Sequence, residues 1–401
     1  MPAERAREPD MDAADRAAPR SALEGRSWRG PLSRLLDSPA FIAWAARTPG
    51  LRRIARREAV AIFDLMAGFV RTQILAGIVE TGVLDAVCAG EDDPDALCRR
   101  CGVPRDRLAV LLRGAAATGL LRITRAGRVR ATRRGRLILA VPGIEGMIRH
   151  HGILYGDLAD PASFFRGGTE PALAAFWPYV FGGGAGAGQA AAYSRLMTET
   201  QTLVAEETLR LVDLRGVRRL LDVGGGSGAF LAAAGRAHPD LELMLFDLPD
   251  VLAAADTGGG RISLHAGNFR SDPLPRGADA ISLIRVLYDH EDDTVLRLLR
   301  AARDALPEGG LLILSEPMSG GDRHPDPITD TYFAVYTLAM RTGRTRAPDE
   351  IARLLERAGF TDLRHRPGYR PFIASAITAR RPAAGRAPGG AGIAAQTVNL
   401  D

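Results

Sequence analysis

The chain has 401 residues, 46% hydrophobic and 25% charged, which is typical of a globular protein with room for two domains. Its formal net charge is +5 and the basic residues are spread along the chain, so the composition does not indicate nucleic-acid binding. There are three cysteines, no apolar signal segment and no run of 18 apolar residues. These features predict a cytoplasmic protein without a transmembrane helix.

Both ends of the chain are predicted to be disordered. Residues 1–30 are rich in Ala, Pro and Arg, and residues 382–401 are rich in Gly, Ala and Pro. Between them, Cys98 and Cys101 form a C-x-x-C pair. A zinc site usually needs a second pair of ligands, and nothing nearby supplies one, so we predict no metal.

Residues 55–150 have the pattern of a winged-helix domain. Apolar residues at helical spacing run through 63–79, and two further helices are predicted at 95–101 and 104–118, followed by a two-stranded hairpin within 119–132. The second of these helices offers arginines but no Asn, Gln, Ser or Lys to read base edges, which disfavours DNA binding. We interpret the domain as a dimerisation domain.

Residues 151–200 are predicted to form helices and loops rich in aromatic residues. Phe176 and Trp177 lie in this stretch, which has no clear periodicity. The aromatic side chains fit ordinary core packing and the lining of an apolar substrate cavity equally well. We expect the segment to link the two domains.

Strands alternate with helices from residue 201 to about 380. This alternation predicts an α/β fold, a Rossmann-like doubly wound and mainly parallel sheet. Helices are predicted at 294–306 and 348–358. The predicted strands are 219–223, 242–246, 262–265, 280–284, 310–314 and 372–377.

The first of these strands ends in a glycine-rich turn that opens a helix. Asp222 precedes Gly224, Gly226 and Gly228, whose spacing is G-x-G-x-G. Glycines there permit a sharp turn and the close approach of a ligand. An NAD enzyme would have G-x-G-x-x-G and a pyrophosphate contact at the helix N-terminus, which disfavours an oxidoreductase. S-adenosylmethionine (SAM) carries a ribose and a carboxylate but no phosphate.

Residues after the next strands complete a predicted nucleoside site. Asp247 ends the second strand, where a carboxylate can accept bonds from ribose hydroxyls or cap the following turn. Asn268 and Phe269 follow the third strand and suit adenine recognition, although an ordinary loop fits them as well. The predicted cofactor-binding residues are Asp222, Gly224, Gly226, Gly228, Asp247, Leu248, Gly267, Asn268, Phe269 and Arg285.

Four segments resemble the SAM-dependent O-methyltransferases that have a winged-helix dimerisation domain. These segments are 221–230, 246–249, 267–269 and 315–317, and the resemblance extends over residues 55–380. It implies SAM as methyl donor, a homodimer and no metal.

Three further segments resemble the acyclic carotenoid methyltransferases of purple photosynthetic bacteria. They are 284–293, 315–321 and 334–344. This resemblance implies methylation of the tertiary C-1 hydroxyl of hydroxyneurosporene or demethylspheroidene. Such an apolar substrate suggests transient contact with the surface of the intracytoplasmic membrane.

The chain departs from the wider family at the catalytic base. The family usually has His-Asp-Trp after the fourth strand, and this chain has Tyr288-Asp289-His290. Tyr288 therefore occupies the base position, and Glu316 matches the glutamate that orients the family histidine. The base role is left open between Tyr288 and His290, because neighbours two apart rarely point to the same side. Glu316 alternatively caps the turn at Pro317.

Predicted substrate-binding residues follow from the same comparison and from the aromatic segment: Met340, Tyr336, Phe176 and Trp177. Core packing is the alternative for Met340. Two other functions stay open. One is O- or C-methylation of another apolar pigment or polyketide. The other is a SAM-sensing winged-helix regulator, which would need no acid–base residues.

Overall fold

The computed structural model describes residues 38–176, 200–370, 373–383 and 394–395. The segment predicted to be disordered at residues 1–30 lies outside the described residues, and so does most of 382–401. Two compact units divide the chain, residues 1–73 and residues 74–401.

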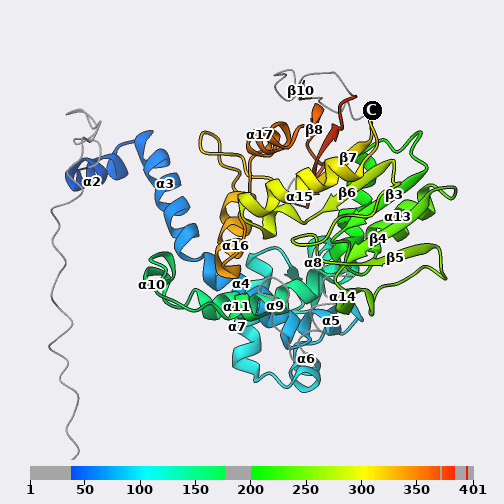
Figure 1. Ribbon diagram of the computed structural model, residues 1–401. Helices are drawn as coiled ribbons and strands as arrows, with labels where there is room; N and C mark the ends of the chain where they lie inside the picture. Colours follow the sequence, from blue (N-terminus) through cyan, green and yellow to red (C-terminus); the bar gives the residue numbers. More distant parts are fainter. Residues whose placement is uncertain (1–37, 177–199, 371–372, 384–393, 396–401) are drawn as a thin grey trace, which may run out of the picture. The chain divides into compact units, whose positions relative to one another are not determined.

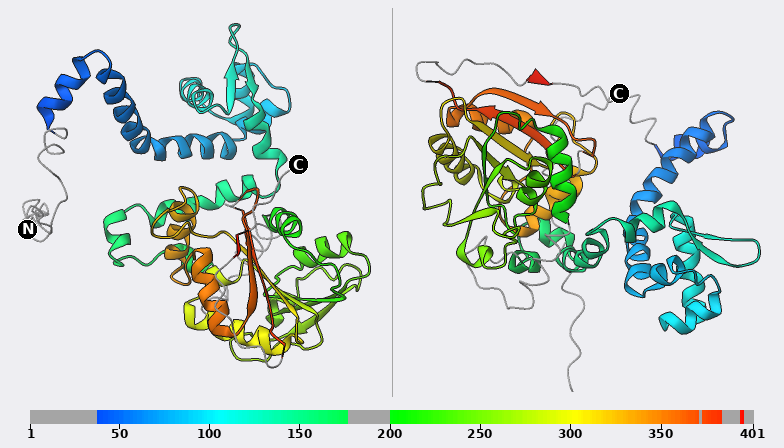
Figure 2. Two further views of the ribbon diagram at one scale, coloured as in Figure 1. Left: turned by 90° about the horizontal axis from the view of Figure 1, so that it is seen from above. Right: turned by 90° about the vertical axis from the view of Figure 1, so that its right-hand side faces the viewer.

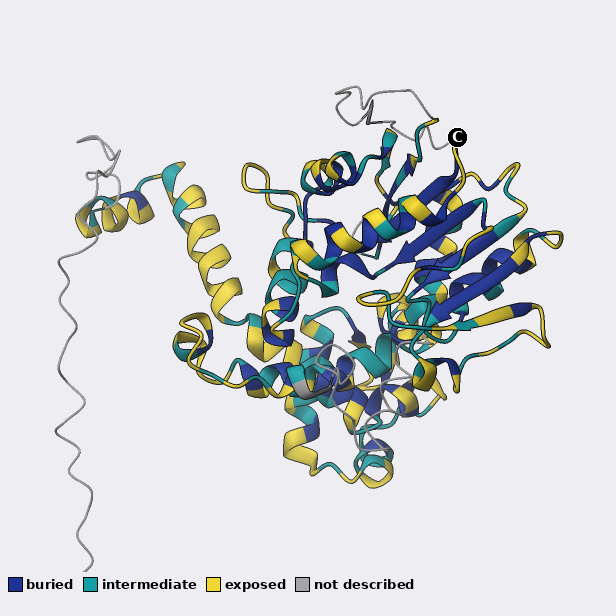
Figure 3. Ribbon diagram, viewed as in Figure 1, coloured by how far each residue is buried: buried dark blue, intermediate teal, exposed yellow. Residues whose placement is uncertain are grey.

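The described part of the first unit, residues 38–73, is mainly helical. It holds α2 (Pro39–Arg47), α3 (Leu51–Met66) and the first turns of α4 (Gly68–Glu80). Helix α2 starts on Ser38, whose hydroxyl accepts the amide of Phe41. Helix α3 has no buried residue, and Figure 3 draws it almost entirely as exposed. No single described helix is long and apolar enough to cross a membrane; α3 and α4 together, as a bent pair, pass that test on length and composition.

The second unit opens with the predicted winged helix. Helices α5 (Val83–Cys88), α6 (Pro94–Cys101) and α7 (Arg105–Ala117) precede a hairpin of β1 (Leu121–Ile123) and β2 (Val129–Ala131). Asp93 caps α6, and the chain returns into α8 (Arg133–Ala140). The bounds agree with the sequence prediction within a few residues. The core of the winged helix is formed by buried aliphatic side chains of α4–α8 and the hairpin.

Three helices connect the winged helix to the sheet domain. They are α9 (Ile144–Asp157), α10 (Pro161–Phe165) and α11 (Ala172–Phe176). Helix α9 begins earlier than the linker predicted at residue 151. Helices α9 and α11 pack on α16 (Ala334–Met340), forming a small separate core. Residues of the linker thus contact the C-terminal third of the chain.

The sheet domain contains eight strands in the order β10-β8-β9-β7-β6-β3-β4-β5 (Figure 1). Five adjacent strands are parallel, from the edge strand β5 (Ile262–Ala266) through β4 (Glu242–Asp247), β3 (Arg219–Val223) and β6 (Ala280–Ile284) to β7 (Leu311–Glu316). Strand β9 (Ser375–Arg380) runs antiparallel between β7 and β8 (Thr361–Arg366). Two residues of β10 (Ala394–Ala395) pair with β8.

Alternate residues of β3, β4, β6 and β7 enter two different cores. In β3, Leu221 and Val223 face the core under α15 (Asp292–Ala305) and α17 (Pro348–Ala358), and Leu220 faces the opposite core. The opposite core contains α13 (Ala229–Ala237), α14 (Pro249–Leu252) and the helical residues 200–211. Figure 2 shows helices on both sides of the sheet. A sheet covered on both faces explains its continuous apolar strands.

Two strand predictions at the C-terminal edge need correction. The strand predicted at 372–377 lies at 375–380, and β8 was not predicted at all. Strand β8 reads Thr-Asp-Leu-Arg-His-Arg, only Leu363 is buried, and a register shift interrupts its pairing. A strand with so few apolar residues has no period-2 signal to detect. The other predicted strands and both predicted helices are confirmed within two residues.

Candidate active site

The C-terminal ends of β3, β4, β6 and β7 meet where the strand order reverses between β3 and β6. Open α/β sheets bind ligands at this point. All of the polar residues predicted from 222 to 316 lie on or just after these strands or on β5.

The glycine-rich turn has backbone angles that require glycine. Gly224, Gly226 and Gly228 have φ of 70°, 58° and 80°, a region that side-chain-bearing residues rarely adopt. Gly224 donates its amide to the carbonyl of Phe246 at 2.8 Å, which ties the turn to β4. Gly228 is the N-cap of α13. The turn therefore presents bare backbone at the end of β3.

Asp247 is bonded to the glycine-rich turn. Its Oδ2 accepts the amide of Gly226 at 2.8 Å, and its Oδ1 accepts the amide of Leu248 at 2.7 Å. Burial raises the pKa of Asp247, and the two backbone hydrogen bonds oppose that shift. Each carboxylate oxygen can accept a second bond, so the side chain keeps capacity for ribose hydroxyls.

Asp222 lies beneath the turn with no solvent exposure. Its Oδ1 accepts the hydroxyl of Ser282 at 2.6 Å, while its Oδ2 has no partner. Burial raises the pKa of Asp222 to about 7, and the nearby charge of Asp247 adds to the shift. A Cβ on Gly225 would lie 2.3 Å from this carboxylate, so glycine is needed at 225 as well.

The loop after β5 lies beside these residues. A Cβ on Gly267 would lie 2.6 Å from the ring of Phe246, which excludes larger residues. Asn268 uses its own Oδ1 to accept the amide of Arg270, a local turn. The ring of Phe269 lies 5.2 Å from that of His290 in an edge-on arrangement. His290 thus packs at the Phe269 end of the site.

After β6 the chain turns sharply through Arg285, which has φ of 57°. Its guanidinium donates to Tyr288 Oη at 3.0 Å and lies 5.6 Å from the centre of that ring. Tyr288 is buried, and burial raises its pKa. Among the ion pairs of the described residues, none joins Arg285 to Asp289 or Asp292, and Asp292 pairs with Arg344 and Arg346 instead.

Glu316 supports the turn that carries Tyr288. Its Oε2 accepts the amides of Leu287 at 3.1 Å and Tyr288 at 3.2 Å, and its Oε1 has no partner. Glu316 therefore contacts the backbone of Tyr288, whose hydroxyl is bonded to Arg285 instead. Burial raises the pKa of Glu316 to about 7. Asp289 also has a buried oxygen without a partner, and burial raises its pKa to about 8.

Three carboxylates with unpartnered buried oxygens thus gather at adjacent strand ends: Asp222, Asp289 and Glu316. Buried polar atoms without partners are rare and call for an explanation. A cationic ligand would supply the missing partner and lower all three pKa values. The sulfonium and ammonium groups of SAM have this charge, so the residues present fit SAM.

The sequence prediction did not identify Arg346. It is fully buried, and it donates to the carbonyls of Leu287 at 2.9 Å and His290 at 2.7 Å while pairing with Asp292 at 2.6 Å. Gly343 packs so closely that a Cβ would lie 2.0 Å from the carbonyl oxygen of Tyr288. Residues 343–346 therefore hold the 287–290 turn from the outside. No periodicity in the sequence signals this role.

Two of the predicted substrate-binding residues, Tyr336 and Met340, lie on α16 in its small core with α9 and α11. Tyr336 is buried, with Oη 2.7 Å from His150 Nε2, and Met340 is fully buried in the same small core. Phe176 ends α11, and its side chain is outside the described residues, as is the whole of Trp177. Nearby, Tyr332 Oη lies 2.8 Å from His151 Nε2; neither residue was predicted.

Comparison with known proteins identifies the family. Residues 155–361 match the model of the O-methyltransferase domain. The chain is 56% identical to demethylspheroidene O-methyltransferase of Cereibacter sphaeroides over 87% of this chain and 94% of that protein. It is 50% identical to the protein of the same name from Rhodobacter capsulatus, over 84% and 85%.

A solved structure agrees with this result. Human N-acetylserotonin methyltransferase in complex with SAM is similar at a TM-score of 0.69 with 25% identity, over 81% of this chain and 98% of that one. The chain belongs to the SAM-dependent O-methyltransferases.

Proposed function

We propose that this enzyme transfers the methyl group of SAM to the tertiary C-1 hydroxyl of an acyclic hydroxycarotenoid, such as demethylspheroidene or hydroxyneurosporene. The observation that carries the acceptor is the 56% identity to a demethylspheroidene O-methyltransferase over nearly its whole length. The observation that supports the donor is the group of unpartnered buried carboxylates beside the glycine-rich turn.

The donor half of the site uses the residues around the glycine-rich turn. We propose that Asp247 binds the ribose hydroxyls, and that Phe269 and Asn268 lie against the adenine, with His290 packed behind Phe269. Asp222 and Glu316 face the cationic part of the donor. SAM supplies a methyl group on a sulfonium, so the reaction is an in-line displacement that depends strongly on orientation.

The acceptor half is centred on Tyr288. Because Tyr288 Oη accepts a hydrogen bond from Arg285, its own proton is free to be donated. We propose that this phenol positions the oxygen of the acceptor alcohol, and that Glu316 and Arg346 hold the turn that carries it. Tyr336, Met340 and the 151–200 segment with Phe176 and Trp177 are proposed to line the channel for the polyene.

The test is methylation by the purified full-length enzyme. With SAM and a 1-hydroxy acyclic carotenoid in detergent micelles, mass spectrometry is expected to show a methoxy product. Aromatic polyketides and phenols serve as competing acceptors. Turnover of those alone would replace the carotenoid with another apolar acceptor, and SAM binding without any methylation would favour a sensor.

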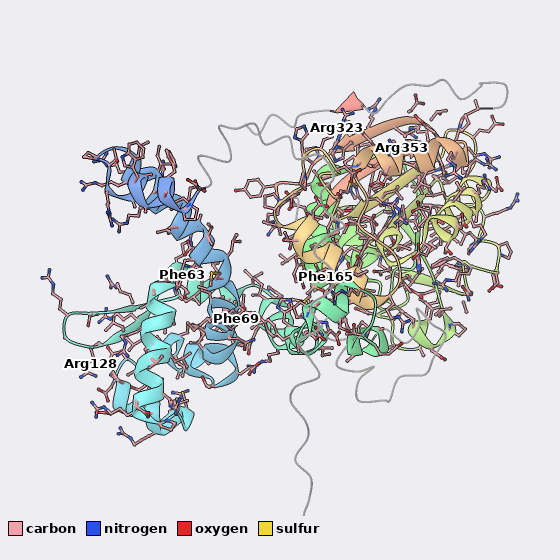
Figure 4. The ribbon with its side chains drawn as sticks, turned by 90° about the vertical axis from the view of Figure 1, so that its left-hand side faces the viewer. Phe63, Phe69, Arg128, Phe165, Arg323 and Arg353 are labelled. Atoms are coloured by element: carbon pink, nitrogen blue, oxygen red, sulfur yellow. The ribbon has the colours of Figure 1, made fainter. Side chains whose placement is uncertain are left out.

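We further propose that the enzyme is a homodimer through the apolar end of α3 and the start of α4. Phe63, Leu65 and Phe69 are 66%, 84% and 69% exposed, and Figure 4 labels two of them on these helices. Contiguous exposed apolar residues mark interaction sites. Sedimentation of wild type as a dimer and of Leu65→Asp as a monomer would support this contact.

The membrane surface is the proposed source of the substrate, for an otherwise cytoplasmic enzyme. The first half of α3 exposes Arg52, Arg53, Arg56 and Arg57, next to exposed Trp44 and Ile54. Basic and apolar residues together favour anionic lipid surfaces. Co-flotation with vesicles of anionic lipid, lost when the four arginines become serine, is the expected result; equal flotation of the variant contradicts it.

A further inference from the structure

The buried oxygens without partners near the turn after β6, Asp289 Oδ1 and Glu316 Oε1, belong to carboxylates that would face the cationic donor. Tyr288 Oη is bonded to Arg285, a group that stays protonated, and Glu316 contacts only the backbone of the turn through its bonded oxygen. His290 packs on Phe269, and its Nδ1 lies 3.1 Å from Arg270. The alcohol must nevertheless lose its proton as the new C–O bond forms.

Helix α9 brings two histidines to this region from the other side. His151 Nε2 lies 2.8 Å from Tyr332 Oη, and His150 Nε2 lies 2.7 Å from Tyr336 Oη. Met147, His151 and Tyr155 are four residues apart and share one face of α9. Met147 Sδ lies 3.5 Å from Tyr332 Oη, but a thioether is a weak acceptor beside an imidazole nitrogen.

Tyr332 lies in the same cluster as Tyr288. Its ring is 4.9 Å from that of Phe333, and the ring of Phe333 is 6.5 Å from that of Tyr288. The charge of Arg285 opposes the upward shift that burial causes in the pKa of Tyr332, so the guanidinium is close to both phenols. Tyr332 belongs to a π-helical turn, η3 (Thr329–Phe333), a type of irregularity that is frequent at functional sites.

We propose that the His151–Tyr332 pair is the proton acceptor of the methyl transfer, an inference that rests on the proposed function. As the alcohol oxygen bonds to the methyl carbon, the carbon–sulfur bond breaks and its electron pair stays on sulfur, which becomes a neutral thioether. The O–H bond of the alcohol breaks, and its proton passes to Tyr332 Oη. The proton of Tyr332 passes to His151 Nε2, which leaves an imidazolium.

The surroundings of His151 suit this role. Burial lowers its pKa, so the imidazole is neutral and able to accept at pH 7. The titratable and charged groups that face the pair are His150 and Tyr155 on α9, Tyr336 on α16 and Arg285 after β6. Arginine lowers the pKa of a phenol and so favours transfer through Tyr332.

His150 provides a matched control on the same helix. It is the neighbouring residue, is buried, and makes the same type of bond to a tyrosine, Tyr336, which belongs to the small core with Leu154 and Leu173. Its substitution is expected to lower thermal stability. It should leave the fall of kcat at acid pH in place.

The experiment measures kcat against pH for the full-length enzyme on the 1-hydroxycarotenoid. His151→Gln and Tyr332→Phe are each expected to lower kcat about 100-fold, to leave SAM affinity unchanged by calorimetry, and to abolish the fall of kcat on the acid side. The double variant should be no slower than either single one, because the two residues act as a unit. Added imidazole is expected to raise the kcat of His151→Ala toward that of wild type. It should not change the kcat of His150→Ala.

Two results would overturn the proposal. One is a kcat of His151→Gln within threefold of wild type with its acid-side fall retained. The other is loss of that fall in Asp289→Asn alone, which would make the carboxylate the acceptor. If wild type methylates a different acceptor and no hydroxycarotenoid, the proposed substrate fails, and the same variants tested on that acceptor still decide the role of His151.

Discussion

Single residues at the strand ends carry the electrostatics of the donor site. Within the part of the chain that the structure describes, the side chain of Asp222 has no ion-pair partner and is bonded to Ser282 alone. Its motif was predictable because the turn that follows needs glycine. Its raised pKa was not predictable, because burial depends on the whole sheet. Arg346 shows the same division, since a fully buried arginine cannot be distinguished in sequence from the exposed Arg344 beside it.

Asp222→Asn tests the charge of the donor site. A ligand cation favours the carboxylate, so SAM affinity of the wild type should rise as the pH passes through about 7, the pKa of Asp222. The variant should bind about tenfold more weakly at pH 8, or about 1.4 kcal/mol, with a smaller pH dependence. In Ser282→Ala the lost hydrogen bond should move the midpoint to higher pH. Calorimetry from pH 6 to 8 measures both; a wild-type affinity that is flat with pH would exclude the idea.

Arg346→Ala tests the support of the Tyr288 turn. The change removes the partner of two carbonyls and of Asp292. Hydrogen bonds to charged groups are worth about 1.5–3 kcal/mol each, so we expect the free energy of unfolding to fall by an amount on the order of 3 kcal/mol. We also expect kcat to fall. Arg344 also pairs with Asp292 but is 42% exposed, so Arg344→Ala should cost less than about 1 kcal/mol. Denaturant unfolding of both variants gives the comparison. Equal losses would show that Arg346 has no special role.

At the scale of elements, the predicted bounds of a strand or helix agree best with the observed ones where its sequence has a strong apolar pattern. Strands β3 and β6 consist mostly of apolar residues and were predicted with their observed bounds. Strand β8 and the π-helical turn η3 were missed because their residues lack a matching period and acquire their conformation from pairing and packing. The edge of the sheet and the acceptor side of the site are therefore the parts that the sequence described least well.

At the scale of the molecule, buried ionisable groups act in opposite directions on stability. Burial lowers the pKa of His150 and His290 to about 4, so the stability they contribute is present above pH 6.5 and is lost as the pH falls toward 4. Burial raises the pKa values of Asp222, Glu316 and Asp289 to about 7, 7 and 8. Their contribution is present in acid and is lost as the pH rises through 7–8.

Thermal unfolding between pH 6.5 and 8 reports mainly on the carboxylates, because His150 and His290 are neutral in the folded enzyme there and histidines of the unfolded chain are mostly neutral above pH 7. We expect the Tm of the ligand-free enzyme to fall over this range. The corresponding free energy of unfolding should decrease by up to about 1.4 kcal/mol per pH unit for each carboxyl that is still protonated. Saturating SAM should reduce the fall, since a bound cation favours ionisation. Asp289→Asn should also reduce it. A Tm that rises from pH 6.5 to 8 would contradict these pKa directions.

The α/β class and the elements of the winged helix could be predicted from the sequence, and the residues of the proposed donor site were predicted from it as well. These features depend on short-range constraints: glycine at positive φ, apolar periodicity and an acidic residue at a strand end. The surroundings of the proposed acceptor site depend on the tertiary structure. His151 and Tyr332 are 181 residues apart in sequence, and helix α9 must pack on η3 and α16 before the two can meet. No local pattern encodes such a contact, because the energy that forms it comes from burying both surfaces at once.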